Sequence, residues 1–349
     1  MVLAVAGMTA CGDDDNSRDE PQPAPVNEVY SVAFYNLENL FDTINNNGDN
    51  DFEFSPKAPK QWNSDKYWKK QHNMAYTISQ LTLTDTPDGP AVIGVSEVEN
   101  LSVLKDLVNQ PELKDRGYQI VHHDSPDRRG IDVALLYNPK YFKVLNVTNQ
   151  RLYIPSYKTF KTRDQLCVTG LLAGEKVSVL VNHWTARSGD PAPSSYLREA
   201  EAKQARETID SLLLDDPTQG VIFMGDLNDN PSDKSCSVVL RAMKSMNEVT
   251  GSFGVYNPWW TILEKGTGSL SYQSQWNLFD QIVMTEYFTH YATSSTRPHL
   301  TFQRAEVFNR PFLLTNYGTP KRTFSGDSFQ NGYSDHLPTR IFLTKQVPQ

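Results

Sequence analysis

A carboxylate and an amide follow a short apolar run in the stretch Val221–Asp229, VIFMGDLND. The run is too short for a helix and is bounded by Gly220 and Gly225, which predicts a strand that is buried on both faces. Asp226 and Asn228 follow at the C-terminal end of that strand. Since residues two apart in an extended chain point the same way, we expect this carboxylate and amide to address one ligand. Asp, Asn and Gly are also ordinary turn formers, so the motif alone fits a solvated turn equally well.

The same arrangement recurs along the chain. Five further apolar runs carry an acid, an amide or an imidazole at one end: Asn36 and Glu38 after 29–35, Glu97 after 91–96, His183 after 177–181, Asp280 before 281–284, and Asp335 with His336 before 337–343. Some of these groups close their strand and others open it. Bringing them to one edge therefore requires strands that run in both directions, in one mixed sheet or in two packed sheets.

Helices and loops are predicted between these strands. The first helix is expected over residues 66–83, with Trp68, Met74, Ile78 and Leu81 facing the core. Its basic start, residues 66–70, is expected to be a solvated face. The remaining elements are a surface loop near the site over 42–64, helices over 101–108 and 195–214, and strands over 118–122, 131–137, 143–153 and 166–172.

Residues 1–28 are predicted to lie outside the fold. Met1–Cys11 is a short apolar segment of small residues that ends in a cysteine, which is typical of the end of a lipoprotein signal and too short to span a bilayer. Residues 12–26 are acidic and contain proline, as in a flexible tether. The alternative is a frayed N-terminus with a chance cysteine. We expect lipid anchoring at Cys11, which would hold the protein at a membrane of the cell envelope, in the outer membrane, the periplasm or at the surface.

Composition predicts one folded domain over residues 29–349. No linker or repeat interrupts this part, and we expect it to be monomeric. The net charge of the chain is −8, but residues 1–28 hold six acids and one arginine, so the rest carries a formal charge near −3 and is not a basic nucleic-acid clamp. Cys167 and Cys236 are expected to be buried apolar residues, because neither has zinc-site spacing.

With these motifs in hand, the chain resembles the endonuclease/exonuclease/phosphatase superfamily, of which deoxyribonuclease I is a member. The motifs occur in the family's order over nearly the whole folded chain: YNLEN with Asn36 and Glu38, VSEVEN with Glu97, VNHW with His183, GDLND with Asp226 and Asn228, FDQIV with Asp280, and YSDHLP with Asp335 and His336. The resemblance implies an α/β fold, a four-layer α/β/β/α sandwich of two mixed sheets flanked by helices. Glu38 is a departure, because many members have Asp there.

The resemblance also implies roles for the residues. Glu97 is expected to be the principal metal ligand, assisted by Glu38 and Asp335, with Asn36 supporting them. Asp226 is expected to polarise the attacking water, Asn228 to hold that water or a phosphate oxygen, and His183 and His336 to donate to phosphate oxygens. Asp280 is expected to orient His336, and Asp132 to orient His183.

The chemistry agrees with this assignment. Oxygen ligands without cysteine suit Mg²⁺, with Mn²⁺ or Ca²⁺ as substitutes. A cation of this kind would offset phosphate charge and activate water for hydrolysis of a phosphoric ester. Arg129, in the segment PDRRGID, is a candidate phosphate contact, although a surface ion pair is the simpler interpretation.

Three functions fit these residues. We expect a metal-dependent nuclease of low sequence specificity, because the candidate contacts Lys66, Lys69, Lys70, Arg128 and Arg129 would grip only backbone charge. The alternative is a phosphatase or phospholipid phosphodiesterase that uses the same site on an inositol phosphate or sphingomyelin. A non-catalytic binding protein is disfavoured, because every catalytic position of the pattern holds a competent residue.

Overall fold

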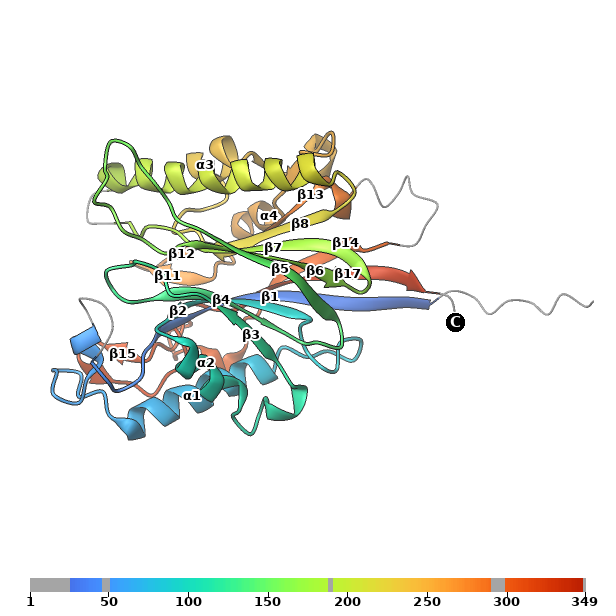
Figure 1. Ribbon diagram of the computed structural model, residues 1–349. Coiled ribbons are helices and arrows are strands. Elements are labelled where there is room, and N and C mark those ends of the chain that lie inside the picture. Colours follow the sequence, from blue (N-terminus) through green and yellow to red (C-terminus); the bar gives the residue numbers. More distant parts are fainter. Residues whose placement is uncertain (1–25, 46–50, 188–190, 290–298, 348–349) are drawn as a thin grey trace, which may run out of the picture.

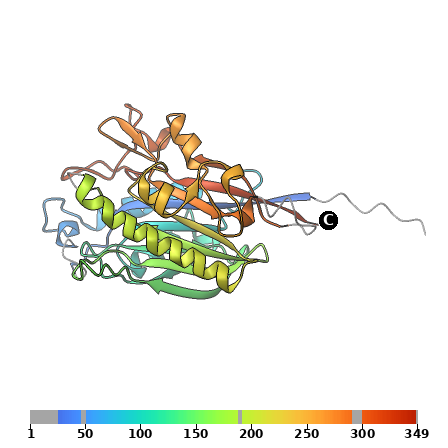
Figure 2. The same cartoon turned by 90° about the horizontal axis from the view of Figure 1, so that it is seen from above.

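Two β-sheets stacked face to face form the centre of the computed structural model, and helices cover the outer face of each sheet (Figure 1). The structure describes residues 26–45, 51–187, 191–289 and 299–347. Helices α1 and α2 cover the first sheet, while α3 and α4 cover the second. Seen from above, α3 runs along the outside of the sheet that it covers (Figure 2). The predicted four-layer sandwich is confirmed.

The first sheet is mixed. Its β1 strand pairs in parallel with β2 and antiparallel with β17, and the remaining neighbours are antiparallel. In spatial order its strands are β14 (Thr301–Val307), β17 (Thr339–Val347), β1 (Val26–Leu40), β2 (Val92–Val98), β4 (Asp132–Tyr137) and β3 (Gln119–His122).

The second sheet is also mixed. Its β8 strand pairs in parallel with β7 and antiparallel with β13. In spatial order its strands are β5 (Phe142–Gln150), β6 (Gln165–Leu172), β7 (Glu175–His183), β8 (Gly220–Asp226), β13 (Asp280–Thr285), β10 (Val255–Tyr256) and β9 (Ala242–Met243). Two hairpins stand apart, β11 (Leu270–Tyr272) with β12 (Gln275–Asn277), and β15 (Phe324–Ser325) with β16 (Ser328–Phe329).

Strand β8 shows why its run of apolar residues is unbroken. Ile222 and Met224 belong to the core between the two sheets, whereas Val221 and Phe223 belong to the core beneath the outer helices. Because alternate side chains enter different layers, and both layers are closed to water, every position must be apolar. The expected strand, buried on both faces, is therefore confirmed.

The helices are α1 (Ser64–Ser79), α2 (Leu101–Val108), α3 (Pro191–Asp215) and α4 (Trp259–Glu264). Helix α1 begins after Asn63, whose side chain accepts a hydrogen bond from the Lys66 backbone, and it ends four residues before the predicted end. Two predictions about α1 were wrong. Trp68 is 46% exposed instead of facing the core, and Lys70, expected in the solvated face, is buried. The apolar stripe runs through Tyr67, Met74 and Ile78, and Lys70 lies on that inward face while Trp68 lies beside it.

The N-terminal strand is longer than expected. It begins at Val26, which pairs with Val347, so residues 26–28 belong to the sheet and not to the predicted tether. Cys11 lies outside the described residues. Across the described ranges, no helix has both the length and the apolar character needed to cross a membrane. Cys167 and Cys236 are buried free thiols, as expected.

Candidate active site

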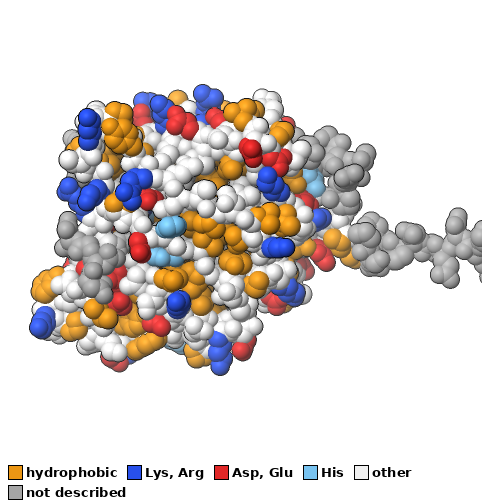
Figure 3. Space-filling view, in the orientation of Figure 1, with side chains coloured by type: hydrophobic (Ala, Val, Ile, Leu, Met, Phe, Trp, Pro, Cys, Tyr) orange, Lys and Arg blue, Asp and Glu red, His pale blue; other side chains and the backbone are white. Residues whose placement is uncertain are grey.

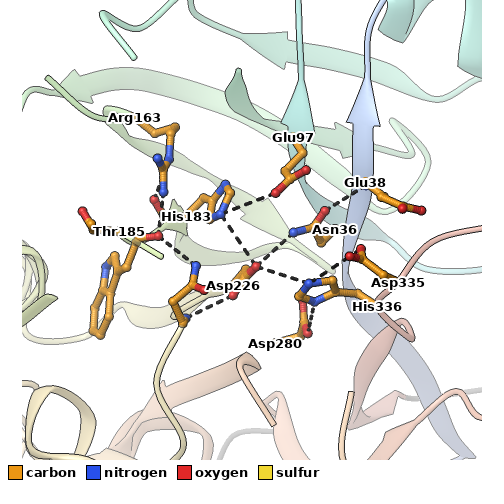
Figure 4. A network of polar contacts seen from close by, with 12 residues as sticks. Asn36, Glu38, Glu97, Arg163, His183, Thr185, Asp226, Asp280, Asp335 and His336 are labelled. Carbon is orange, nitrogen blue, oxygen red and sulfur yellow. Dashed lines mark hydrogen bonds and ion pairs between the residues drawn. The ribbon is translucent and has the colours of Figure 1, made fainter. Parts of the chain in front are cut away.

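The polar strand ends of both sheets converge at one end of the sandwich (Figure 4). The first sheet contributes Asn36 and Glu38 from β1, Glu97 from β2, and Asp335 with His336 from the segment that leads into β17. The second sheet contributes His183 from β7, Asp226 from β8 and Asp280 from β13. The structure thus brings together the polar strand ends that the sequence indicated, across the gap between the sheets.

Irregular backbone conformations set the directions of the Glu38 and Glu97 side chains. Glu38 has φ 47°, Glu97 has φ 59° and Asn228 has φ 49°, all in the left-handed region that non-glycine residues rarely adopt. The pairing register of β1 with β2 shifts between Asn36 and Leu40, and that of β2 with β4 shifts between Ser96 and Val98. A bulge of this kind turns a side chain out of the regular alternation of a strand. Each such conformation costs about 1–3 kcal/mol, and residues of this kind cluster at functional sites.

Asp226 stands at the centre of the group. Its Oδ2 accepts a hydrogen bond from Asn36 Nδ2 at 2.9 Å and lies 3.7 Å from the Nε2 atoms of both His183 and His336. Its Oδ1 accepts the backbone N–H of Asn228 at 3.0 Å. Burial raises the pKa of Asp226 to about 6, with the nearby charge of Asp280 adding to the rise and that of His336 opposing it. A carboxylate whose pKa lies close to neutral is suited to accept a proton.

His336 is held by Asp280, as expected. The Nδ1 of His336 lies 2.7 Å from Asp280 Oδ2, and the same carboxylate oxygen accepts the hydroxyl of Ser269. Burial alone would lower the pKa of His336, but the charges of Asp280 and Asp226 raise it well above its usual value. The imidazole is therefore held in its cationic form, with Nε2 directed at Asp226.

The prediction that Asp132 orients His183 was wrong. Asp132 contacts His122 Nε2 at 3.0 Å and accepts the backbone N–H of Ser125 at 2.8 Å. The backbone of His183 is instead fixed by Arg163, whose Nε donates to the carbonyl oxygen of His183 at 3.0 Å. Asp132 opens strand β4, and the neighbouring strand β3 supplies its partner, His122.

Burial lowers the pKa of His183 well below its usual value, and the charge of Arg163 lowers it further. The Arg163 guanidinium also donates to the backbone oxygen of Trp184 and forms a buried ion pair with Asp127 at 3.0 Å. His183 is therefore a neutral imidazole that offers one N–H, whereas His336 is cationic.

Asn228 is partly engaged by its own surroundings. Its side-chain Nδ2 donates to the carbonyl oxygen of Trp184 at 3.0 Å, and its backbone carbonyl oxygen accepts a hydrogen bond from Nε of Arg187 at 2.9 Å. These bonds fix the turn after β8 beside the strand end that carries His183.

Glu97 is bonded to the backbone of Asn39 and to Arg129. Its Oε2 accepts the backbone N–H of Asn39 at 2.9 Å and lies 3.3 Å from Nη2 of Arg129. Burial alone would raise the pKa of Glu97, but the charges of Arg129 and His336 lower it well below its usual range. Arg129 is thus paired with a carboxylate of the site, Glu97.

A divalent cation fits these residues. The carboxylates of Glu38 and Asp335 line one cavity together with Asn39 and Arg129. Glu97 accepts hydrogen bonds from the backbone of Asn39 and from the Arg129 guanidinium. Carboxylate oxygens without thiolates suit Mg²⁺, Mn²⁺ or Ca²⁺. Within the part of the chain that the structure describes, the groups of three with ligand atoms inside 4.8 Å are Asp226, Asp280 and His336, and His122, Asp124 and Asp132. The predicted trio of Glu38, Glu97 and Asp335 is more widely spread than either.

Sequence reasoning missed the cations that line this cavity of about 400 Å³. Lys60 from the loop before α1 and Arg322 from the loop before β15 face it with Arg129, and aromatic walls come from Phe41, Phe54 and Phe324. Described residues of the predicted loop over 42–64 thus do stand at the site. Neither cation lies in a strand-end motif, so no local signal in the sequence marked them.

Comparisons with known proteins agree with this geometry. The chain matches the model of the Endonuclease/Exonuclease/phosphatase family over residues 31–345. No curated protein matches the sequence. Among solved structures, an endonuclease/exonuclease/phosphatase family protein from Bacteroides thetaiotaomicron is 15% identical with a TM-score of 0.54, covering 92% of this chain and 96% of that one.

Two further solved structures that resemble this chain are those of a phosphatase and of a protein solved with DNA. The mannosyl-6-phosphatase from Bacteroides thetaiotaomicron VPI-5482 is 16% identical with a TM-score of 0.53, covering 90% of this chain and 99% of that one. TDP2 from D. rerio, complexed with single strand DNA product, is 13% identical with a TM-score of 0.55, covering 90% of this chain and 98% of that one. At these identities the likeness shows the fold, and the family match together with the six motifs shows that the chain belongs to the endonuclease/exonuclease/phosphatase family.

Proposed function

We propose that the protein hydrolyses a phosphoester with the help of a divalent cation bound near Glu38, Glu97 and Asp335. The observation that best supports this proposal is the position of Asp226. Its Oδ2 accepts a hydrogen bond from Asn36 and lies 3.7 Å from the Nε2 atoms of both His183 and His336. A water placed beside this oxygen would lose its proton to Asp226 as it attacks phosphorus. The bond from phosphorus to the ester oxygen breaks, and that oxygen takes a proton from solvent water, so that the products are phosphate and the free alcohol.

The other residues stabilise charge on the phosphoryl group. His336, held cationic by Asp280, donates through Nε2 to a phosphate oxygen, and neutral His183 donates its single N–H to another. When bound, the cation neutralises phosphate charge and lowers the barrier to attack. Arg129 beside Glu97 adds a fixed guanidinium on the same side.

The shape of the site favours a small phosphoester over a polymer. The cavity of about 400 Å³ gathers Lys60, Arg129 and Arg322 beside the candidate metal ligands, each paired with an acid: Glu53, Glu97 and Asp335. Three cations in so small a space suit the concentrated charge of a single phosphate group. One of the similar structures is that of a mannosyl-6-phosphatase, which is consistent with this class.

The nuclease predicted from the sequence is the competing proposal. TDP2, a similar structure, was solved with single strand DNA product. Three of the five cations expected to grip a nucleic-acid backbone are engaged elsewhere, because Lys70 is buried beside Glu38, Lys69 pairs with Asp65, and Lys66 donates to the Lys60 carbonyl oxygen. Acidic and basic side chains are also interspersed over the face shown in Figure 3. A groove that binds a nucleic-acid backbone would need positively charged side chains along its whole length, without acids between them.

One panel of substrates separates these proposals. The purified protein is incubated with Mg²⁺ or Mn²⁺ and with phosphate monoesters, a small diester, an inositol phosphate, sphingomyelin and single- and double-stranded DNA, with and without EDTA. We expect release of inorganic phosphate from monoesters, lost in EDTA. Efficient cleavage of DNA with slow monoester turnover would favour the nuclease, and inertness on every substrate would overturn phosphoester hydrolysis itself.

We also propose that lipidation of Cys11 anchors the domain at the cell envelope. Support comes from the apolar segment that ends at Cys11 and the acidic, proline-containing stretch that follows. Val26 stands ten residues before Asn36 on β1, which places the start of the domain roughly 33 Å from the site. The site would therefore face away from the attachment point.

A further inference from the structure

A second groove adjoins the cavity lined by Glu38, Arg129 and Asp335 and has no role in the chemistry described so far. It has a volume of about 780 Å³ and shares Arg322 and Asp335 with that cavity. One wall is the turn of the β11–β12 hairpin, including Tyr272, and the other is the turn over residues 315–319, including Tyr317. This volume lies within the range of about 300–1,000 Å³ that is usual for sites that bind small molecules.

The two tyrosines are exposed on the walls of this groove. Tyr317 is 94% exposed and Tyr272 is 65% exposed. Exposed aromatic side chains offer flat apolar faces with a polar tip, and such faces are used to stack planar or ring-shaped ligands. Two of them in one groove go beyond the scattered exposed residues that any surface carries.

Both tyrosines stand on turns fixed by hydrogen bonds. Tyr272 precedes Gln273 and Ser274, which have φ of 48° and 64° and close the hairpin. Tyr317 lies between Thr315 and Thr319, whose backbones are joined by a hydrogen bond of 2.8 Å. Turns closed in this way hold a stacking surface in place, which lowers the entropy lost when a ligand binds.

The hairpin wall is tied to the catalytic residues. Leu270 of β11 forms an isolated bridge with His336, and Leu337 donates its backbone N–H to the Ser269 carbonyl oxygen at 2.7 Å. The hydroxyl of Ser269 donates to Asp280. The hairpin wall of the groove and the pair of Asp280 and His336 are therefore parts of one hydrogen-bonded frame.

The chemistry of the lining indicates the ligand. Three charged residues line the groove, Lys321, Arg322 and Asp335, and the last two form an ion pair of 3.1 Å. The remaining polar positions are uncharged hydroxyls and amides: Ser271, Gln273, Ser274, Thr315, Asn316, Thr319, Ser325 and Gln330. Amide and hydroxyl groups both donate and accept hydrogen bonds, as the hydroxyls of a sugar do.

From this lining we propose that the groove binds the sugar part of a phosphorylated carbohydrate, while its phosphate lies between Asp226 and the candidate metal ligands. The sugar ring stacks its C–H face on Tyr272 or Tyr317, and the amides of Gln273, Asn316 and Gln330 bind its hydroxyls. A nucleic-acid strand would also stack on tyrosine, but it brings one negative charge per nucleotide, and outside the Arg322–Asp335 pair the lining offers Lys321 as its cation. This assignment rests on the proposed phosphoester hydrolysis and narrows its substrate.

Steady-state kinetics test the assignment. The probes are mannose, glucose and galactose 6-phosphates, with glycerol 3-phosphate as a monoester too short to fill the groove and a 5′-phosphorylated oligonucleotide as the competing polymer. The variants are Tyr272→Ala and Tyr317→Ala, with Tyr153→Ala as the matched control, because Tyr153 is also 65% exposed and lines neither cavity.

We expect each groove variant to raise KM for the preferred hexose phosphate about five- to tenfold while kcat/KM for glycerol 3-phosphate stays unchanged. Tyr153→Ala should match the unaltered protein on both. The assignment is overturned if neither groove variant changes hexose phosphate kinetics, if no hexose phosphate is hydrolysed although other phosphoesters are, or if the variants impair oligonucleotide cleavage alone. A protein that hydrolyses no phosphoester with metal present would instead refute the proposed function.

Discussion

The ammonium of Lys70 lies 3.8 Å from Oε2 of Glu38, with the lysine side chain fully enclosed. The same nitrogen donates to the Thr323 hydroxyl and to the carbonyl oxygen of Tyr333 at 2.6 Å. Burial raises the pKa of Glu38 to about 7, with the charge of Asp335 adding to the rise and that of Lys70 opposing it. Lys70 therefore helps to keep a candidate metal ligand ionised and ties it to the segment that carries Asp335.

Replacing Lys70 should weaken cation binding. In Lys70→Met the Glu38 carboxylate loses its counter-charge, protons compete better with the cation, and we expect the apparent Kd for Mn²⁺ to rise by at least about tenfold. Lys69→Met is the matched control, because Lys69 is exposed and pairs with Asp65 at the surface. Binding is measured by titration followed by Mn²⁺ paramagnetic resonance, and circular dichroism checks the fold. An unchanged Kd in folded Lys70→Met would refute this role.

Three substitutions should remove most of the activity without unfolding the protein. Asp226→Asn, His183→Ala and His336→Ala are each expected to lower kcat by at least about a hundredfold, because each deletes a proton acceptor or donor at the phosphoryl group. The measurement is turnover on the best phosphoester at saturating Mg²⁺, with melting temperature as the control. Full turnover by the His336 variant, or by the unaltered protein in excess EDTA, would contradict the mechanism.

Two aspartates that both contact a histidine should behave differently. Asp280→Asn removes the charge that keeps His336 cationic, so we expect kcat to fall by at least about tenfold. Asp132→Asn changes a carboxylate that bonds to His122 and Ser125, and it should leave kcat close to that of the unaltered protein. If Asp132→Asn lowered kcat as much as Asp280→Asn does, Asp132 would have a role in catalysis after all.

The pH profile should show an acidic limb. Asp226, with its pKa raised to about 6, accepts a proton only when ionised, so kcat/KM is expected to fall as pH drops below about 6. The pKa of His336 is raised well above its usual value, so the cationic donor persists above neutral pH and activity should be retained there. Higher Mg²⁺ favours ionised carboxylates and should move the limb to lower pH. A limb that lies above pH 7 and ignores Mg²⁺ would argue against Asp226 as the acceptor.

The proposed lipid anchor at Cys11 can be tested by analysing the N-terminus of the mature protein. Mass spectrometry of protein purified from native membranes should find a mature chain that begins at a diacylated or triacylated Cys11. Cys11→Ser should release the protein into the soluble fraction while its specific activity stays the same, since Cys11 precedes the first strand, β1, by fifteen positions in the sequence. An unmodified N-terminus upstream of Cys11, or a soluble protein in intact cells, would count against lipidation.

The apolar runs of the sequence were sufficient to predict the main strands, whereas the four layers were predicted from the family resemblance. Apolar runs with polar ends predicted the main strands, and opposite placement of the polar group predicted strands of both directions. These features are local, because a strand buried on both faces must be apolar throughout and a ligand-binding group must stand where the strand leaves the core. The motif order then pointed to the family that the comparisons confirmed.

The directions and partners of individual side chains could be determined only from the tertiary structure. Alternation along β1 cannot reveal a bulge that gives Glu38 a φ of 47°, and the partner of Asp132 depends on which strand lies beside β4. Lys70 illustrates the same limit. Its place on the inward stripe of α1 follows from helical spacing, but its burial is tolerable only because Glu38, Thr323 and Tyr333 meet it from distant parts of the chain.

By itself, then, the sequence determined the strands, the family and the polar groups at the strand ends. The tertiary structure decided which of these groups touch, which cations surround the cavity and where the second groove opens. Lys60, Arg322 and Tyr317 belong to loops whose positions are set by packing against other elements. Because no local periodicity links such loops to the strands, their convergence becomes visible only when the chain is folded.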